Sequence, residues 1–448
     1  MYNRNGSIST YVNICSDSIF CIMKAVLSNR IYLTVDEKLE SMIDKQLTYK
    51  IPSYNPLDPP QVIKNMGFVR AGLVTMPIGR LDLIPSNYEI VDKRMTVPVK
   101  FPEFKLELRE SQQAVYNEVE DNCIINAWVS WGKTFTALAI AAKLGQKTLV
   151  IVHTLALRTQ WEREVEKVFG IKAGIIGSGK FNIDSPIVIG NVQSLYRKVP
   201  DIINKFGTII LDEMHHVSSP TFARVVDKSL ARYKIGLSGT IERKDGKHVV
   251  FRDYFGQKVF MPPKENYMTP SIDVIHSDIR FMDGANIPWA RKINQLAWNE
   301  EYRHSLAMIA SAYASKGHKV LVVSDRVELL KKCAELSGDR ALVITGDIPH
   351  MERPDMMKRI DIDKDILYGT QSIFSEGISL NSLSCLVLGT PVNNDPLLTQ
   401  LIGRVIREQE GKKDPVIIDI NLLGKTARRQ ANNRLGYYMK QGYVVNHL

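Results

Sequence analysis

The sequence predicts an α/β protein in which two parallel-sheet lobes follow one another in tandem, behind a small mixed α+β N-terminal domain. Three observations support this fold class. At 448 residues, the chain is too long for one hydrophobic core. Apolar segments alternate with amphipathic helical segments from about residue 106 and again from about residue 298. The preceding part is rich in proline and in short segments of alternating polarity. We expect domains at residues 1–105, 106–262 and 263–448.

Composition narrows the class of protein. The formal charge of +10 and the pI near 9.1 are explained equally well by a polyanionic partner and by a basic surface that maintains solubility. The five cysteines form no CxxC pair, which disfavours a zinc site or a disulfide framework. No apolar run is long enough to span a bilayer, so we expect no membrane association. The early segment "SIFCIMKAVL" reads as a strand rather than a signal peptide.

In the first lobe, strands are expected at "CIINA", "KTLVIVH", "SPIVIG", "GTIILDE" and "KIGLSGT". The helix "TFTALAIAAKLG" should end at Gly145, because glycine readily takes the left-handed conformation of a helix C-terminus. A second helix should begin after Thr154, whose hydroxyl can cap it. Its buried face is indicated by apolar residues at fourfold spacing: Leu157, Trp161, Val165 and Phe169.

In the second lobe, strands are expected at "KVLVVSD", "ALVITG", "DILYGT", "CLVLGTP" and "PVIIDI". Residues 271–289 contain an Asp283-Gly284 turn signal, which fits either a hairpin that separates strands of a ligand or a plain connection between lobes. The basic C-terminal segment has a helical pattern. We expect its tyrosines to pack on the second lobe and its arginines to face solvent.

The stretch "NAWVSWGKTF" joins a predicted strand to a predicted helix and contains Gly132, Lys133 and Thr134. A loop in this position presents backbone N–H groups to a phosphate. Gly132 lets the backbone approach closely, Lys133 would reach the β and γ phosphates of ATP, and Thr134 would ligate Mg²⁺. A chance match at a helix start is the alternative for this loop taken alone.

The second motif is "TIILDEMHH", an apolar strand that ends in Asp212 and Glu213. Acidic residues at the C-terminal edge of a parallel sheet lie beside the phosphate loop. Asp212 would hold Mg²⁺, and Glu213 would act as general base on the attacking water. The pairing of both motifs in the expected order makes a simple helix-capping acid the weaker explanation.

At these residues the chain resembles the DExH-type helicases of superfamily 2, and in particular phage recombination and branch-migration helicases. The resemblance covers about residues 106 to 420 and includes the family's motifs in order: "LRESQQAVY", "VHTLALRTQW", "GNVQSL", "LSGT" followed by "RKDG", "VLVVSD", "YGTQSIFSEGISL" and "QLIGRVIRE". It implies two RecA-like lobes, ATP and Mg²⁺ as cofactors, and a nucleic-acid partner. The scattered cysteines fit a reducing cytosol, so we expect a cytoplasmic protein, in the host cytoplasm if the gene is a phage gene.

The resemblance also implies roles for further residues. It implies an adenine-sensing glutamine at Gln112 or Gln113, and a nucleotide contact at Gly377. Arg404 and Arg407, three apart and expected on one helix face, would stabilise the transferring phosphoryl group from the second lobe. It also implies a set of residues that couple the nucleotide site to the nucleic-acid track: His215, His216, Ser238, Thr240 and Gln400. We prefer this coupling role for the two histidines over metal binding.

The family's nucleic-acid track implies contacts made largely with the phosphate backbone. The matching positions are polar residues at strand ends, where turn capping is the ordinary explanation: Thr154, Arg158, Gln193, Ser194, Thr370 and Gln371. The N-terminal domain is either a DNA-engaging module, with Tyr54 stacking on a base, or a capping domain with ordinary surface charge. Its basic residues are Arg30, Arg70, Arg80, Lys93, Arg94 and Lys100.

The loop departs from the family pattern because Ser130 stands where a glycine is usual, with Trp131 next to it. A positive φ at Ser130 would cost about 1 kcal/mol or more. Since the other nucleotide-site residues are intact, we expect an active ATPase with a modified loop that takes part in nucleotide binding. The function expected is ATP-dependent unwinding or remodelling of branched DNA. The alternatives are an RNA helicase and a nucleic-acid-binding scaffold with a weakened ATP site.

Overall fold

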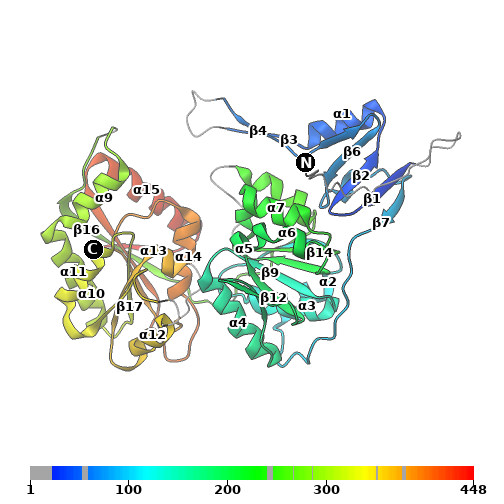
Figure 1. The fold of residues 1–448 in the computed structure, drawn as a ribbon. Helices are drawn as coiled ribbons and strands as arrows, with labels where there is room; N and C mark the ends of the chain where they lie inside the picture. Colours follow the sequence, from blue (N-terminus) through cyan, green and yellow to red (C-terminus); the bar gives the residue numbers. More distant parts are fainter. Residues whose placement is uncertain are drawn as a thin grey trace, which may run out of the picture.

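The computed structural model describes residues 23–52, 59–239, 246–265, 267–284, 286–349, 352–375 and 380–448. Figure 1 shows three parts: a small N-terminal domain in blue, a lobe in cyan and green, and a second lobe in yellow to red. The α/β class with two parallel-sheet lobes behind a mixed α+β domain is confirmed. Within the described residues, no helix combines the length and the hydropathy that a membrane span requires.

The N-terminal domain is built on a five-stranded sheet in the order β5-β6-β2-β1-β7. Its strands are β1 (Lys24–Leu27), β2 (Arg30–Thr34), β5 (Gly67–Arg70), β6 (Leu73–Pro77) and β7 (Glu89–Asp92). Helix α1 (Glu37–Gln46) buries Ile43 against one face, together with alternate residues of β1 and β2. A two-stranded ribbon of β3 (Thr48–Ile51) and β4 (Gln61–Lys64) extends from it. The strand expected near residues 18–27 is β1; the residues before Met23 lie outside the described part.

Three of the six basic residues considered for DNA contact instead attach this domain to the first lobe. Arg30 pairs with Asp227 at 2.8 Å. Arg80 lies 3.5 Å from Asp253, a fully buried carboxylate that also accepts hydrogen bonds from Tyr49 and Asn65. Arg94 is buried and pairs with Asp121 at 3.4 Å. Arg70, Lys93 and Lys100 stay exposed. The position of Tyr54 lies outside the described residues.

The first lobe holds an eight-stranded sheet in the order β11-β10-β12-β9-β13-β14-β8-β15. Its strands are β8 (Cys123–Asn126), β9 (Thr148–Val152), β10 (Gly174–Gly177), β11 (Lys180–Phe181), β12 (Ile187–Asn191), β13 (Thr208–Leu211), β14 (Tyr233–Ser238) and β15 (Val259–Phe260). Its helices are α2 (Glu110–Glu118), α3 (Lys133–Leu144), α4 (Leu155–Phe169), α5 (Val192–Arg197), α6 (Val199–Ile202), α7 (Pro220–Lys228) and α8 (Phe251–Phe255). All pairs are parallel except that of β10 with β11.

Local sequence signals place the helices that matter for the site. Gly145 ends α3 at φ 61°, and its N–H donates to carbonyls of the last turn. The Thr154 hydroxyl caps α4 by accepting a hydrogen bond from the N–H of Leu157. Trp161 and Val165 then lie fully buried against the sheet. Both helix-boundary predictions are confirmed, because each depends on a residue adjacent to the helix itself.

The second lobe holds a seven-stranded, fully parallel sheet in the order β18-β19-β17-β20-β21-β16-β22. Its strands are β16 (Ser271–Arg280), β17 (Val320–Ser324), β18 (Ala341–Ile344), β19 (Ile366–Thr370), β20 (Cys385–Leu388), β21 (Val416–Leu423) and β22 (Val444–His447). Its helices are α9 (Trp289–Trp298), α10 (Glu300–Ser315), α11 (Val327–Ser337), α12 (Arg353–Ile362), α13 (Gln371–Ser375), α14 (Asp395–Val405) and α15 (Lys425–Lys440). Two apolar clusters, one on each face, fill the space between sheet and helices.

Within the described part of residues 271–289, the structure shows neither a hairpin nor a plain connection between the lobes. β16 is an inner strand of the second sheet, paired with β21 on one side and β22 on the other. The carboxylate of Asp283 accepts hydrogen bonds from the N–H groups of Lys425 and Thr426, at 3.0 and 2.8 Å. Asp283 therefore satisfies the first turn of α15 rather than forming a hairpin turn.

Helix α15 packs on the second lobe, with Tyr437 and Tyr438 buried in its core. The expectation that its arginines face solvent holds for Arg428 and Arg429 but is wrong for Arg434. Arg434 is 4% exposed and makes two hydrogen bonds, at 2.6 and 2.8 Å, to the buried carboxylate of Asp419. A buried arginine is tolerated here because its charge is paired and hydrogen-bonded.

Candidate active site

The phosphate loop leaves the C-terminal end of β8 and enters α3 through two left-handed residues. Gly132 has φ 89°, as expected of a glycine that begins a helix in this manner. Ser130 has φ 71°, a conformation that costs a residue with a Cβ roughly 1–2 kcal/mol. The Ser130 hydroxyl is buried and, among the described residues, makes no hydrogen bond. It lies at the wall of a cavity between the lobes, where a ligand oxygen could pair with it.

Lys133 lines the same cavity, and its ammonium group donates to the carbonyl of Ala127 at 2.9 Å. Burial lowers its pKa, while the carboxylates of Glu213 and Asp212 act in the opposite direction. Removing an ammonium from water is costly unless anions surround it. Lys133 is therefore held at the base of the loop by one carbonyl, with its charge turned toward two acids.

Asp212 and Glu213 follow β13 and occupy the cavity wall beside the loop. The carboxylate of Asp212 accepts from the indole N–H of Trp161 at 2.8 Å and from the N–H of Glu213 at 3.0 Å. Burial and the neighbouring charge of Glu213 raise the pKa of Asp212, although Trp161 and Lys133 oppose the rise. Two hydrogen-bond donors thus fix the direction of this carboxylate.

Glu213 has a left-handed backbone, φ 49°, so the chain turns sharply after β13. Its carboxylate lies 3.2 Å from Nδ1 of His215. Burial acts to raise the pKa of Glu213, but the hydrogen bond and charge of His215, with the charge of Lys133, outweigh burial and lower the pKa to about 2. Glu213 is therefore a carboxylate at any physiological pH, as a general base requires.

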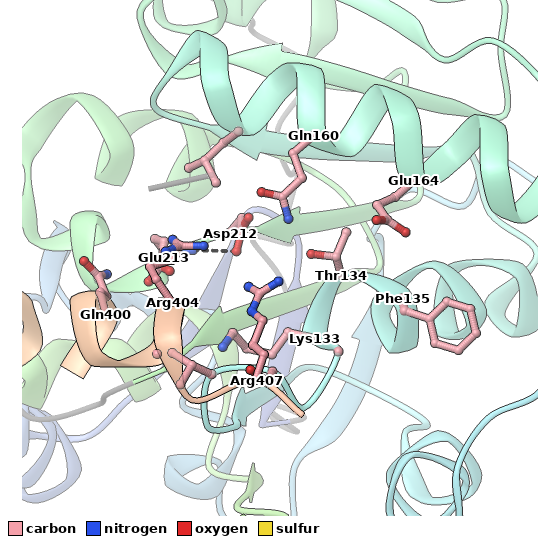
Figure 2. A pocket seen from close by; sticks show the side chains of 15 residues that line it. Lys133, Thr134, Phe135, Gln160, Glu164, Asp212, Glu213, Gln400, Arg404 and Arg407 are labelled. Atoms are coloured by element: carbon pink, nitrogen blue, oxygen red, sulfur yellow. Dashed lines mark hydrogen bonds between the residues drawn. The ribbon is translucent and has the colours of Figure 1, made fainter. Parts of the chain in front are cut away.

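The second lobe contributes Gln400, Gly403, Arg404 and Arg407 to the opposite wall of the cavity. Figure 2 shows Arg404 beside Glu213 and Arg407 beside Lys133, so the cations of one lobe face the acids and the lysine of the other. The side chain of Arg404 is oriented by a hydrogen bond to the carbonyl of Phe374 at 2.7 Å. At Gly403 an added Cβ would lie 2.6 Å from the side chain of Val129, so glycine permits the close approach of the two lobes.

The expectation that Arg404 and Arg407 share one helix face is wrong. Helix α14 ends at Val405, and Ile406 is its C-cap. Arg407 instead forms an isolated antiparallel bridge with Tyr267, and the N–H of Met268 donates to the carbonyl of Ile406 at 2.7 Å. Tyr267 and Met268 belong to the connection between the lobes, which runs from the end of β15 to the start of β16. Pairing with this connection competes with continuation of the helix, so Arg407 lies on an extended segment.

The side chains of Gln112 and Gln113 have different surroundings and different hydrogen-bond partners. The amide of Gln112 is buried and donates to the carbonyl of Trp131 at 2.7 Å, so it holds the phosphate loop. Gln113 is exposed and bonds to Asn117 on its own helix. The side chain of Trp131 is also placed differently from our expectation of a nucleotide contact. It is fully buried in the first-lobe core, and only its backbone belongs to the loop.

Sequence reasoning missed Gln160 and Glu164, which line the cavity from α4. Figure 2 shows the amide of Gln160 directed toward the space beside Asp212, with Glu164 one turn further along the helix near Thr134. Their fourfold spacing places them on one face of α4, next to the stripe occupied by Trp161. This spacing was the available signal, although polar residues on a helix usually face solvent. The remaining unpredicted wall residues are Val129, Phe135 and Leu157.

The coupling candidates lie partly in the described residues. Gln400 reaches the cavity, whereas Ser238 is fully buried at the end of β14, where its carbonyl accepts from the N–H of Ala127. The rings of His215 and His216 are 4.3 Å apart, and that of His216 lies 4.1 Å from His153. Within the part of the chain that the structure describes, no cluster of three metal-binding side chains occurs. Thr240 and Gly377 lie outside the described residues.

Four nucleic-acid candidates of the first lobe gather at one edge of its sheet. Arg158 donates to Asn191 at 3.1 Å and to the hydroxyl of Ser178 at 3.0 Å. The side chain of Asn191 in turn donates to the carbonyl of Thr154 at 3.1 Å, while Gln193 and Ser194 begin the next helix. In the second lobe, Gln371 donates to Thr390 at 3.1 Å, and the hydroxyl of Thr370 is buried. Of these residues, Thr154 caps a helix, whereas the hydroxyl of Thr370 makes no hydrogen bond within the described residues.

Two family models match the chain. Residues 105–243 match the type III restriction enzyme res subunit model, and residues 303–409 match the helicase conserved C-terminal domain. Together they cover β8 to β14 of the first sheet and β17 to β20 of the second, and they contain Lys133, Asp212 and Arg404.

Related proteins come from several viruses. A protein named probable helicase D10, from Escherichia phage T5, is 44% identical over 94% of this chain and 95% of its own length. A protein of Acanthamoeba polyphaga mimivirus, provisionally named an ATP-dependent RNA helicase (L396), is 26% identical over 92% of this chain and 83% of its own length. The ATP-dependent DNA helicase uvsW of Enterobacteria phage T4 is 23% identical over 72% of this chain and 70% of its own.

A solved structure shares the fold. It is a fragment of a protein provisionally identified as the HsdR subunit of a type I restriction enzyme from Vibrio vulnificus YJ016. The likeness has a TM-score of 0.57 at 18% identity and covers 77% of this chain and 69% of the fragment. At this identity the likeness concerns only the arrangement of the elements.

Proposed function

This chain belongs to superfamily 2 of the helicases, and we propose that it is an ATP-dependent DNA helicase or translocase that unwinds or remodels branched DNA such as forks and junctions. The observation that carries the proposal is the cavity between the lobes. It unites Lys133, Asp212 and Glu213 of one lobe with Arg404 and Arg407 of the other. Such a site closes only when the lobes approach each other, so nucleotide binding and lobe movement are linked.

The residues present fit a magnesium–nucleotide complex. The unpaired hydroxyl of Ser130 and the buried Nε of Arg407, which makes no hydrogen bond within the described residues, both suit phosphate oxygens. Lys133 would hold the β and γ phosphates, while Thr134 and Asp212 would hold Mg²⁺. When bound there, Mg²⁺ would neutralise phosphate charge and help to align the phosphates.

Hydrolysis would then depend on groups from both lobes. Glu213, ionised and fixed by His215, would orient a water molecule and accept its proton. Arg404 and Arg407 would neutralise the charge that develops on the transferring phosphoryl group. Because both arginines belong to the second lobe, release of phosphate would loosen the contact between lobes and let them separate.

We favour DNA as the polymer because the motifs at and after the end of β14, "LSGT" and then "RKDG", resemble those of phage and repair DNA helicases. The relative from phage T4 is named as a DNA helicase, whereas the mimivirus relative is named as an RNA helicase. An RNA helicase is therefore the second candidate. A scaffold without turnover is the third, and the complete set of acids and arginines argues against it.

Steady-state ATPase activity tests the proposal. It should be measured without polymer and with single-stranded DNA, forked DNA, four-way DNA and RNA, with Lys133→Ala as the inactive control. We expect stimulation by DNA that is greatest with branched DNA. Stimulation by RNA alone would favour the second candidate, and no turnover with any polymer would favour the scaffold. Lys133→Ala should still bind DNA, since loss of both activities would indicate misfolding.

A further inference from the structure

The connection between the lobes contacts the phosphate loop directly. The ammonium of Lys264 lies 4.0 Å from the centre of the Trp128 ring and donates to Gln441 at 2.8 Å. The next residue, Glu265, forms an ion pair with Arg109 at 3.2 Å and accepts a hydrogen bond from the hydroxyl of Ser111. The connection therefore does more than join the two lobes, because two of its successive side chains, Lys264 and Glu265, bind to the first lobe.

Both partners of Glu265 touch the same loop residue. The hydroxyl of Ser111 accepts the indole N–H of Trp131 at 2.8 Å. The guanidinium of Arg109 donates to the backbone carbonyl of Trp131, which also accepts from Gln112. Trp131 is therefore fixed at its indole and at its backbone by a short segment that Glu265 holds in place.

Trp131 lies between the two left-handed residues of the loop, Ser130 and Gly132. Glycine takes a positive φ freely, but serine is strained there. A strained conformation persists only when its surroundings determine it. The contacts that end at Trp131, the residue that follows Ser130, belong to such surroundings.

We propose that Glu265 is a positioning residue for ATP: through Arg109 and Ser111 it fixes Trp131, and so keeps Ser130 in the conformation that accepts the nucleotide's phosphates. The proposal rests on the ATPase function proposed above. The charge of Glu265 alone would contribute little, since about a third of its side chain is exposed. What matters is that it orders two donors at once.

The kinetic test is Glu265→Ala. Because the loop binds phosphate in the ground state and the transition state alike, we expect a KM for ATP raised about tenfold with kcat changed less than about twofold. Glu265→Gln keeps the acceptor for Ser111 and loses the charge beside Arg109, so its KM should be intermediate. The matched control is Glu107→Ala, which removes an exposed carboxylate two residues from Arg109.

A second substitution, Ser130→Gly, tests whether Glu265 acts by supporting the left-handed backbone of Ser130. A glycine needs no support at positive φ, so in the background of Ser130→Gly the further change Glu265→Ala should raise KM by less than about twofold relative to Ser130→Gly alone. Loss of the Ser130 hydroxyl is common to both proteins in this comparison. A rise of about tenfold in that background would overturn the proposal, as would a normal KM in Glu265→Ala.

Hydrogen exchange of the backbone amides of residues 127–134 separates this proposal from the proposed function, because it requires no ATP hydrolysis. In nucleotide-free protein, Glu265→Ala should speed exchange in this segment, and the added Ser130→Gly should slow it again. If the parent protein hydrolyses no ATP but exchange follows this pattern, only the proposed function fails. Unchanged exchange in Glu265→Ala, with normal turnover by the parent, would overturn the positioning role alone.

Discussion

The indole N–H of Trp161 donates to a carboxylate oxygen of Asp212 at 2.8 Å, and both side chains are buried. This bond connects the apolar face of α4 to the residue that we assign to Mg²⁺. The helix that covers the sheet therefore also orients a group in the active site.

Trp161→Phe should retain most of the packing of α4 and remove this one donor. Since the bond lowers the pKa of Asp212, its loss should favour the protonated acid and weaken metal binding. We expect ATP turnover to fall about 10- to 100-fold at low Mg²⁺ and to recover partly as Mg²⁺ is raised. Trp298→Phe is the control, because Trp298 is 65% exposed on α9. A Mg²⁺ dependence identical to that of the parent protein would separate Trp161 from the metal site.

Ser130→Gly should stabilise the protein by about 0.5–1 kcal/mol, because it removes a left-handed serine at some cost in the entropy of the unfolded chain. Urea unfolding of the two proteins measures this difference. Ser311→Gly, inside helix α10, is a control of opposite sign, for which helix propensity predicts a loss of about 0.5 kcal/mol. Destabilisation by both changes would show that Ser130 is not strained.

His215→Ala should move the acid limb of the ATPase pH profile to higher pH. His215 is a main cause of the lowered pKa of Glu213, and burial alone acts in the other direction. Without the imidazole the carboxylate therefore takes up a proton at higher pH, and the general base is lost sooner on acidification. The measurement is kcat between pH 4 and 9, a range in which the parent keeps Glu213 ionised and His215→Ala should lose turnover at the acid end; His304→Ala on the surface of α10 is the control. Coincident acid limbs would remove His215 from its role beside Glu213.

Lys234 gives a prediction about stability. It is 1% exposed, and burial lowers its pKa to about 8. Between pH 8 and the higher pKa of an unfolded lysine, the unfolded chain binds the extra proton, so this group's contribution to stability rises with pH across that interval. Lys234→Met lacks this contribution. The free energy of unfolding of the parent protein relative to Lys234→Met should therefore increase from pH 7.5 to pH 10, and a constant difference would contradict the buried charge.

Much of the fold was predictable because its signals are local. Inner strands such as β9 and β17 are short apolar runs, and Gly145 and Thr154 mark helix ends by chemistry confined to one turn. For the segment around Asp283, neither a hairpin nor a plain connection, the two alternatives that the sequence left open, describes β16, because this strand pairs more than 130 residues later in the chain, with β21 and β22. An Asp-Gly pair indicates a turn but says nothing about distant pairing.

The candidate active site was likewise predictable from local motifs but not from contacts between distant parts of the chain. Motif spacing brought Lys133, Asp212 and Arg404 together correctly around one cavity. The position of Arg407 did not follow from spacing, because its bridge to Tyr267 is a tertiary contact that ends the helix early. The contact of Glu265 with Ser111 also joins distant parts of the chain. No sequence period marks such contacts, and they emerge only when the lobes are placed together.

The most direct test of the account compares Arg407→Ala with the parent protein in two assays, equilibrium binding of a nonhydrolysable ATP analogue and steady-state ATP turnover. If the arginine stabilises the transition state from across the cavity, binding should change only a few-fold while kcat falls on the order of 10³-fold or more. Normal turnover in Arg407→Ala would contradict a nucleotide site completed by the second lobe.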